Sequence, residues 1–360
     1  MARYIYRKIV YGLLVLFGVV TVIFLLFNVL PGDPARMMLG QRADITSVKA
    51  INRDLGRDKP LGLQYLNFLN DLSPISFHST ADANDYWYLD KYKYGNTYKI
   101  LCWEKGNVIA FKEPYLRRSY QSKRKVSEIL AEAFPATMLL ASISMVLATI
   151  LGIGLGIVCA TYKDTWFDRL ALLFSAMGMS LPSFFAAILF AWLFAFVLAD
   201  YTGLSMFGSL YSVDDFGRGE YLDLKNIILP AITLGIRPLA IITELTRSSL
   251  LDVFSQDYIR TARAKGLSKF RVITHHALKN AMNPVITAIS GWFASLMAGA
   301  VFIEYVFDWK GVGVVIVDAL EKYDLPVVMG AVLFISIILI LINIFVDLLY
   351  GLIDPRVRMT

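Results

Sequence analysis

Residues 136–160 read ATMLLASISMVLATILGIGLGIVCA and contain no charged side chain. An α-helix needs about 20 predominantly apolar residues to cross a bilayer. In lipid, only a helix or a closed β-barrel satisfies every backbone polar group. Because this stretch is continuously apolar rather than alternating with a period of two, it predicts a transmembrane helix and not a barrel strand.

Five further apolar runs of similar character extend this prediction along the chain. They are Val10–Leu30, Leu170–Leu198, Ile227–Leu245, Val285–Phe302 and Pro326–Leu352. The composition agrees, because 57% of the 360 residues are hydrophobic and only 18% are charged, against about 25% charged in ordinary soluble domains. The sequence therefore predicts an all-α, polytopic membrane protein with about six transmembrane helices.

Prolines are expected to bend two of these helices, because each removes a backbone hydrogen bond. Ser180-Leu181-Pro182 lies in the third run, and Pro230 and Pro238 lie in the fourth.

Lys and Arg side chains are concentrated in the N-terminal tail, in the second and fourth connections between the runs and in the C-terminal tail, which predicts that both termini are cytoplasmic. The net charge of +6 is thus a topology signal and not a nucleic-acid patch. We expect four parts: residues 1–30, with the first helix; 31–134, extracytoplasmic; 135–353, a helical core whose cytoplasmic loop spans 246–284; and 354–360, a cytoplasmic tail.

The extracytoplasmic segment allows three interpretations. Its stretch Asp85–Tyr98 is dense in Tyr, Trp and Lys, which is consistent with an interfacial belt, a partner surface or the core of a small outer domain. At its end, Ser127 is a candidate N-cap of an amphipathic elbow helix at the membrane interface, and Pro135 would allow a turn into the membrane.

The cytoplasmic loop predicts two helices separated by a glycine. Leu250, Phe254, Tyr258 and Ala262 recur every four residues and define one amphipathic helix. Gly266 can adopt the left-handed conformation that ends it.

The second helix of the loop is expected to begin after the N-cap Ser268, with Leu267, Phe270, Ile273, Ala277 and Ala281 on one apolar face. Asn283 would then cap the fifth transmembrane helix, with Pro284 at its first position. Such a hairpin could fit a groove on another protein, or rest on anionic lipid through its basic face.

One motif in this loop carries a specific resemblance. Residues 257–268, DYIRTARAKGLS, resemble the coupling loop of permease subunits in dipeptide, oligopeptide and nickel ABC importers. The similarity continues in Pro31-Gly32-Asp33-Pro34, Ser180 to Phe184, Leu229-Pro230-Ala231, Glu304 to Phe307 with Gly311-Val312-Gly313, and Asp354-Pro355-Arg356.

The resemblance implies the type I ABC importer permease fold in a bacterial inner membrane. It also implies that the loop docks into a cleft of a cytoplasmic ATPase, with Thr261 at the position where the motif's name has Glu. The residues expected to make this contact are Tyr258, Arg260, Thr261, Ala262, Arg263, Ala264, Lys265, Gly266, Leu267 and Ser268. The implied partners are a second homologous permease, two ATPase subunits, an extracytoplasmic solute-binding protein and membrane lipid.

Catalytic and cofactor-binding patterns are absent from the sequence. It lacks the Gly-x-x-x-x-Gly-Lys-Ser/Thr phosphate loop, so ATP hydrolysis would belong to another chain. Adjacent His275 and His276 point about 100° apart on a helix and do not form a metal pair. We therefore expect no catalytic residue, cofactor or metal.

Two intramembrane charges remain, Arg237 and Glu244, either along a transport pathway or as a buried structural pair. The leading hypothesis is an ATP-driven importer of peptides or related solutes such as glutathione or nickel. An ion-gradient-driven secondary transporter is the alternative, and a membrane-embedded enzyme is disfavoured by the missing catalytic motifs.

Overall fold

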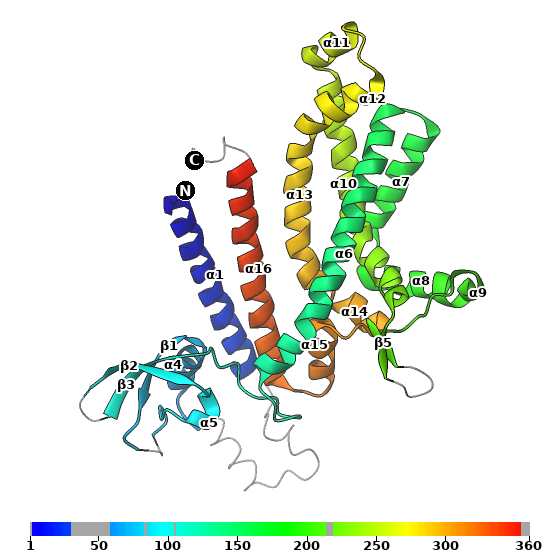
Figure 1. Ribbon diagram of the computed structural model, residues 1–360. Helices are drawn as coiled ribbons and strands as arrows, with labels where there is room; N and C mark the ends of the chain where they lie inside the picture. Colours follow the sequence, from blue (N-terminus) through cyan, green and yellow to red (C-terminus); the bar gives the residue numbers. More distant parts are fainter. Residues whose placement is uncertain (1, 30–57, 83–84, 104–105, 214–218, 354–360) are drawn as a thin grey trace. The chain divides into compact units, whose positions relative to one another are not determined.

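The structure, a computed structural model, describes residues 2–29, 58–82, 85–103, 106–213 and 219–353 (Figure 1). Two of the quoted motifs, Pro31–Pro34 and Asp354–Arg356, lie outside these residues, as does the tail 354–360. The chain forms two compact units. The larger unit contains Met1–Ile5, Ala133–Val315 and Ile338–Thr360, and the smaller unit contains Tyr6–Glu132 and Ile316–Ile337.

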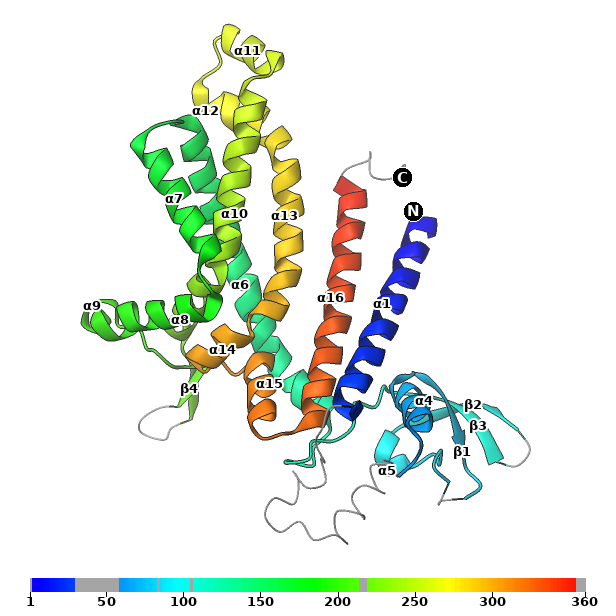
Figure 2. The ribbon, with the colours of Figure 1, turned by 180° about the vertical axis from the view of Figure 1, so that it is seen from behind.

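The larger unit is a bundle of helices around a central one. Helix α10 (Ile228–Phe254) lies between α7 (Trp166–Ser180) and α13 (Leu278–Gly299) in both views (Figures 1 and 2). The unit also holds most of α6 (Val126–Thr161), with α8 (Ser183–Trp192), α9 (Ala199–Thr202), α11 (Asp257–Ala264), α12 (Lys269–Arg271), α14 (Val301–Phe307), and the paired strands β4 (Tyr211–Val213) and β5 (Glu220–Leu222). Helices α15 (Val312–Glu321) and α16 (Leu325–Ile353) contribute to both units.

Small residues let α6 approach α10 closely. A Cβ atom at Gly152 would lie 2.8 Å from Ile242 Cγ2, and one at Gly156 would lie 2.5 Å from Thr246 Cβ. The two glycines are four residues apart and therefore share one face of α6, the spacing by which transmembrane helices commonly pack. The sequence of α6 thus provides both a membrane-spanning length and a contact face for α10.

The number of membrane-spanning elements agrees with the sequence. Four described helices are long and apolar enough to cross a membrane, and two bent helix pairs bring the total to as many as six. One bent pair is α7 with α8 and its continuation to Val197, which meet at 114° across Leu181-Pro182. The expected proline bend in the third run is therefore a complete break, from which α8 and α9 run sideways (Figure 1).

Two predictions about prolines and caps are wrong. Helix α6 begins at Val126 and continues through Pro135, so Ser127 is not an N-cap and no separate elbow helix precedes the span. Helix α13 likewise continues through Pro284, so Asn283 does not begin it. The fourth run is one helix that continues through Pro238, so the proline does not interrupt it. The loss of one backbone hydrogen bond, costing about 3 kcal/mol or more, is outweighed where packing favours a continuous helix.

The smaller unit contains a sheet that the sequence-based all-α prediction did not include. Strands β1 (Ile75–Ser79), β3 (Asn107–Lys112) and β2 (Thr97–Cys102) form a three-stranded antiparallel sheet in that order. Helices α4 (Leu61–Leu72) and α5 (Lys91–Tyr94) belong to the same unit, as does α1 (Ala2–Val29) from Tyr6 onward. Leu89 and Tyr94 pack with Val108 and Ala110, so the aromatic stretch helps to build the core of a small domain.

A polar network lies in this core around Asp71. Tyr94 Oη donates to Asp71 Oδ1 at 2.7 Å, and Lys93 Nζ donates to the same oxygen at 3.0 Å. Lys112 Nζ donates to the Asp71 carbonyl at 2.6 Å, and burial lowers the pKa of Lys112 to about 8. The nearby imidazole of His78 is fully buried, which lowers its pKa to about 4.

Candidate functional site

The loop at one end of the larger unit contains α11 and α12, joined by a tight turn. Gly266 has φ of +75°, its N–H donates to the Arg263 carbonyl at 3.0 Å, and the Leu267 N–H donates to the Ala262 carbonyl at 3.4 Å. This pair of bonds is the Schellman motif, which ends a helix at a left-handed residue. The Ser268 side chain then accepts a hydrogen bond from the Arg271 N–H. Both predicted caps are confirmed.

An apolar cluster fixes this α11–α12 loop to the helices below it. We call it the anchor cluster. Its buried members are Ala160, Leu250, Ile259, Ala262, Val272, Ala277 and Ala281. They come from α6, α10, α11, the π-helical turn Val272–Ala277 and the start of α13, so the cluster joins the loop to the bundle.

The predicted face of the first loop helix needs correction. Helix α10 ends at Phe254 and α11 begins at Asp257, so the regular spacing from Leu250 to Ala262 crosses a break in the helix. Ile259 rather than Tyr258 therefore lies in the anchor cluster. Tyr258 is exposed, and its Oη accepts a hydrogen bond from Asn280 Nδ2 at 2.7 Å.

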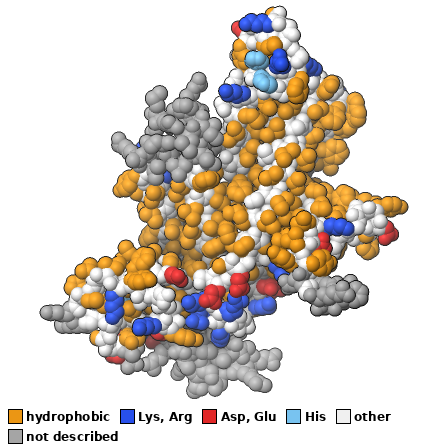
Figure 3. Space-filling view, in the orientation of Figure 1, with side chains coloured by type: hydrophobic (Ala, Val, Ile, Leu, Met, Phe, Trp, Pro, Cys, Tyr) orange, Lys and Arg blue, Asp and Glu red, His pale blue; other side chains and the backbone are white. Residues whose placement is uncertain are grey.

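The outer surface of the loop combines basic and aromatic groups. Of the predicted contact residues, Ala262 is buried and Leu267 half-buried. The others are exposed: Tyr258, Arg260, Thr261, Arg263, Ala264, Lys265, Gly266 and Ser268. Phe270, expected on the buried face, is instead 77% exposed. Basic side chains gather at this end of the larger unit, beyond a broad hydrophobic surface (Figure 3).

An ion pair beside the loop was not anticipated from the sequence. Arg247 Nε lies 2.6 Å from Asp168 Oδ1, and Arg247 Nη2 lies 2.7 Å from Asp168 Oδ2. Asp168 is buried and also accepts a hydrogen bond from the Asp164 N–H. This bidentate pair joins the first turn of α7 to α10 near the loop.

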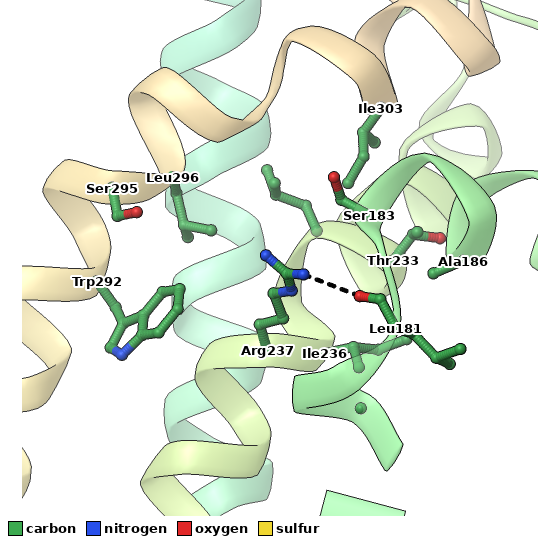
Figure 4. Close-up of a pocket in the computed structure, with 12 residues that line it drawn as sticks. Leu181, Ser183, Ala186, Thr233, Ile236, Arg237, Trp292, Ser295, Leu296 and Ile303 are labelled. Atoms are coloured by element: carbon green, nitrogen blue, oxygen red, sulfur yellow. Dashed lines mark hydrogen bonds between the residues drawn. The ribbon is translucent and has the colours of Figure 1, made fainter. Parts of the chain in front are cut away.

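The two candidate intramembrane charges, Arg237 and Glu244, do not pair with each other in the structure. Glu244 is exposed, and neither it nor Arg237 belongs to an ion pair in the part of the chain that the structure describes. Arg237 lines a cavity of about 80 Å³ at the break between α7 and α8 (Figure 4). Its Nη2 donates to the Leu181 carbonyl at 2.9 Å. A buried pair of Arg237 with Glu244 is therefore excluded.

Metal-binding geometry is not seen in this site. No group of three or more His, Cys, Asp or Glu side chains that could hold a metal ion occurs among the described residues.

The fold is shared with a solved ABC transporter. The chain resembles a chain of the MetNI methionine ABC transporter in an inward-facing conformation, with a TM-score of 0.51 and 14% identity, over 63% of this chain and 97% of that one. This likeness shows that the chain shares its fold with a chain of that ABC transporter.

The family follows from sequence comparison. Residues 152–359 match the family of binding-protein-dependent transport system inner membrane components, and residues 1–83 match the N-terminal part of such components. The chain belongs to this family and is a permease subunit of an ABC importer.

Three curated relatives are similar over nearly their whole length. The dipeptide transport system permease protein DppB of Alkalihalophilus pseudofirmus is 33% identical over 99% of this chain and 100% of its own. The di/tripeptide transport system permease protein DppB of Pseudomonas aeruginosa is 34% identical, and the glutathione transport system permease protein GsiC of Escherichia coli is 33% identical, each over 99% of both chains.

Proposed function

We propose that this permease subunit carries short peptides across the inner membrane and that the α11–α12 loop is its contact with a separate ATPase subunit. The relatives named as dipeptide, di/tripeptide and glutathione permeases support this substrate class. A second permease, two ATPase subunits and an extracytoplasmic solute-binding protein complete the proposed importer. Both termini and the loop are cytoplasmic, and the small sheet domain is extracytoplasmic.

One observation carries the proposed coupling role. The loop presents an exposed, partly basic and aromatic surface on one side and is fixed to three transmembrane helices by the anchor cluster on the other. A partner that moved the loop would move α10 and α13 with it. Helix α10 packs against both α7 and α8, so its movement would reach the break between them. In this proposal ATP binding closes the partner ATPases and so switches access to the pathway between the two sides of the membrane.

Phe270 provides a direct test, because its side chain is exposed and its loss would not disturb the anchor cluster. The matched control is Tyr201→Ala, which removes an aromatic side chain that is 89% exposed on α9. In proteoliposomes holding the assembled importer, Phe270→Ala should lower ATP-driven dipeptide uptake at least tenfold while the control transports normally. A shortened complex lifetime in pull-down with the ATPase should accompany the loss.

Two results would count against a docking role for the loop. One is full coupled uptake by Phe270→Ala. The other is an equal loss of uptake in Phe270→Ala and Tyr201→Ala. Ala262 is unsuitable for this test, because a charge placed at this buried position would disrupt the anchor cluster itself.

A further inference from the structure

The cavity at the break between α7 and α8 is lined by residues of five helices, α7, α8, α10, α13 and α14, and by Leu181 at the break itself. Arg237 comes from α10, Leu181 and Ser183 from the break, and Trp292 and Ser295 from α13. Figure 4 shows the guanidinium extending from α10 toward Leu181 and Ser183, with Trp292 and Ser295 on the opposite wall. The cavity is thus bordered by two spans that the anchor cluster connects to the loop.

The hydrogen-bonding groups of the Arg237 guanidinium are only partly paired in this cavity. Its Nη2 donates to the Leu181 carbonyl, but its buried Nε–H has no hydrogen-bond partner among the described residues. The guanidinium of arginine is a permanent cation in proteins, so its charge stays in the cavity. Charges inside a membrane pair with an opposite charge or with backbone carbonyls, or face a water-filled path, and the Leu181 carbonyl supplies a dipole rather than a full opposite charge.

The adjoining helix end adds positive potential to the same place. Helix α8 begins at Ser183, and its N-cap residue Pro182 provides no side-chain acceptor for the free N–H groups of the first turn. The start of a helix carries about half a positive charge. Arg237 and this helix end therefore favour the same kind of ligand, an anion.

We propose that Arg237 binds the C-terminal carboxylate of a peptide at this break during its passage through the permease. The assignment rests on the proposed peptide substrate. A volume of about 80 Å³ equals the space of about two to three water molecules. It accommodates a carboxylate but not a dipeptide, so the rest of the peptide lies outside the cavity. A guanidinium and a carboxylate form two parallel hydrogen bonds, which gives selectivity as well as affinity.

The test measures peptide binding rather than transport. Radiolabelled dialanine and dialanine amide differ only in the terminal carboxylate, and their binding to the purified permease–ATPase complex without solute-binding protein is measured by equilibrium dialysis. We expect at least a tenfold preference for dialanine in the wild-type complex. Arg237→Gln should abolish the preference, Arg237→Lys should retain part of it, and the control Asp252→Asn, at an exposed position near the end of α10, should retain all of it.

Three results would overturn the proposal: no preference in the wild-type complex, an unchanged preference in Arg237→Gln, or an equal loss of affinity for both peptides in that variant. The last would assign Arg237 a purely structural role through Leu181. These outcomes are separate from failure of the proposed function, which would appear as absence of ATP-driven dipeptide uptake by the wild-type importer.

Discussion

Replacing Gly156 with alanine is expected to weaken the packing of α6 on α10, and Gly154→Ala is its matched control. The two glycines lie in the same apolar stretch of the same helix. An alanine Cβ at position 156 would lie 2.5 Å from Thr246 Cβ and 2.8 Å from the Thr243 carbonyl oxygen, whereas one at position 154 would meet nothing within 4 Å.

The expected loss of stability follows from comparing Gly156→Ala with Gly154→Ala. Both gain the helix propensity of alanine over glycine, about 0.5 to 1 kcal/mol, so this term cancels. What remains is the strain of overpacking, typically about 1 to 3 kcal/mol. We expect the upper part of this range, because one close contact at position 156 is with backbone and cannot move aside.

The buried thiol of Cys159 reports this unfolding directly. Cys159 is fully buried on α6, and Cys102 is exposed. In a Cys102→Ser background, a thiol-reactive dye should therefore label the protein only as the larger unit unfolds on heating. A difference of 1 kcal/mol corresponds to about 2 to 4 °C in Tm for a unit of this size, so Gly156→Ala should melt several degrees below Gly154→Ala. Equal melting temperatures, or a more stable Gly156→Ala, would refute the close α6–α10 contact.

Three further outcomes are expected. The pKa of His78 is lowered from 6.5 to about 4, so folding of the smaller unit is favoured fully above pH 6.5 and progressively less as the pH falls toward 4. Between pH 7 and 4.5 the free energy of unfolding of the smaller unit should fall by about 2 to 3 kcal/mol, as measured by Trp fluorescence melts. An equally large fall in His78→Asn would contradict the role of His78 in this pH dependence. Asp168→Asn should destabilise the larger unit by about 3 kcal/mol, because it leaves Arg247 without its charged partner; a double-mutant cycle with Arg247→Gln that is strictly additive would disprove the coupling. Gly266→Ala should lower the stability of the loop by about 1 kcal/mol, because φ is +75° at this position, although there is space for a Cβ atom. It should also speed hydrogen exchange in α11, and unchanged exchange would argue against the Schellman turn.

Local and continuous signals explain what the sequence could predict. The apolar runs are long and uninterrupted, so the membrane class and about six spans followed from length and hydropathy. Gly266 and Ser268 act on backbone groups within five residues of themselves, so the two caps were also predictable. The break at Leu181-Pro182 was expected as a bend, because the loss of a hydrogen bond is certain but the resulting angle depends on packing.

Long-range packing explains what the sequence did not predict. Asp168 and Arg247 are 79 positions apart, and neither has a neighbour that signals the other. The strands β1 to β3 have five or six residues each, too short for alternation to be distinctive. Phe270 had the helical spacing of a buried residue, but its exposure depends on how α12 meets the π-helical turn Val272–Ala277. The roles of the loop residues and of Arg237 stay predictions until the variants are measured.

Uptake into proteoliposomes tests the central claim most directly, that this chain is moved by a separate ATPase acting on the α11–α12 loop. The assembled importer, with its solute-binding protein, is supplied with labelled dipeptide in the presence of ATP, of a proton or sodium gradient, or of neither. We predict uptake with ATP alone, abolished when the ATPase subunits are omitted and reduced at least tenfold by Phe270→Ala. Uptake that follows an ion gradient and persists without ATP or its ATPase would contradict the account.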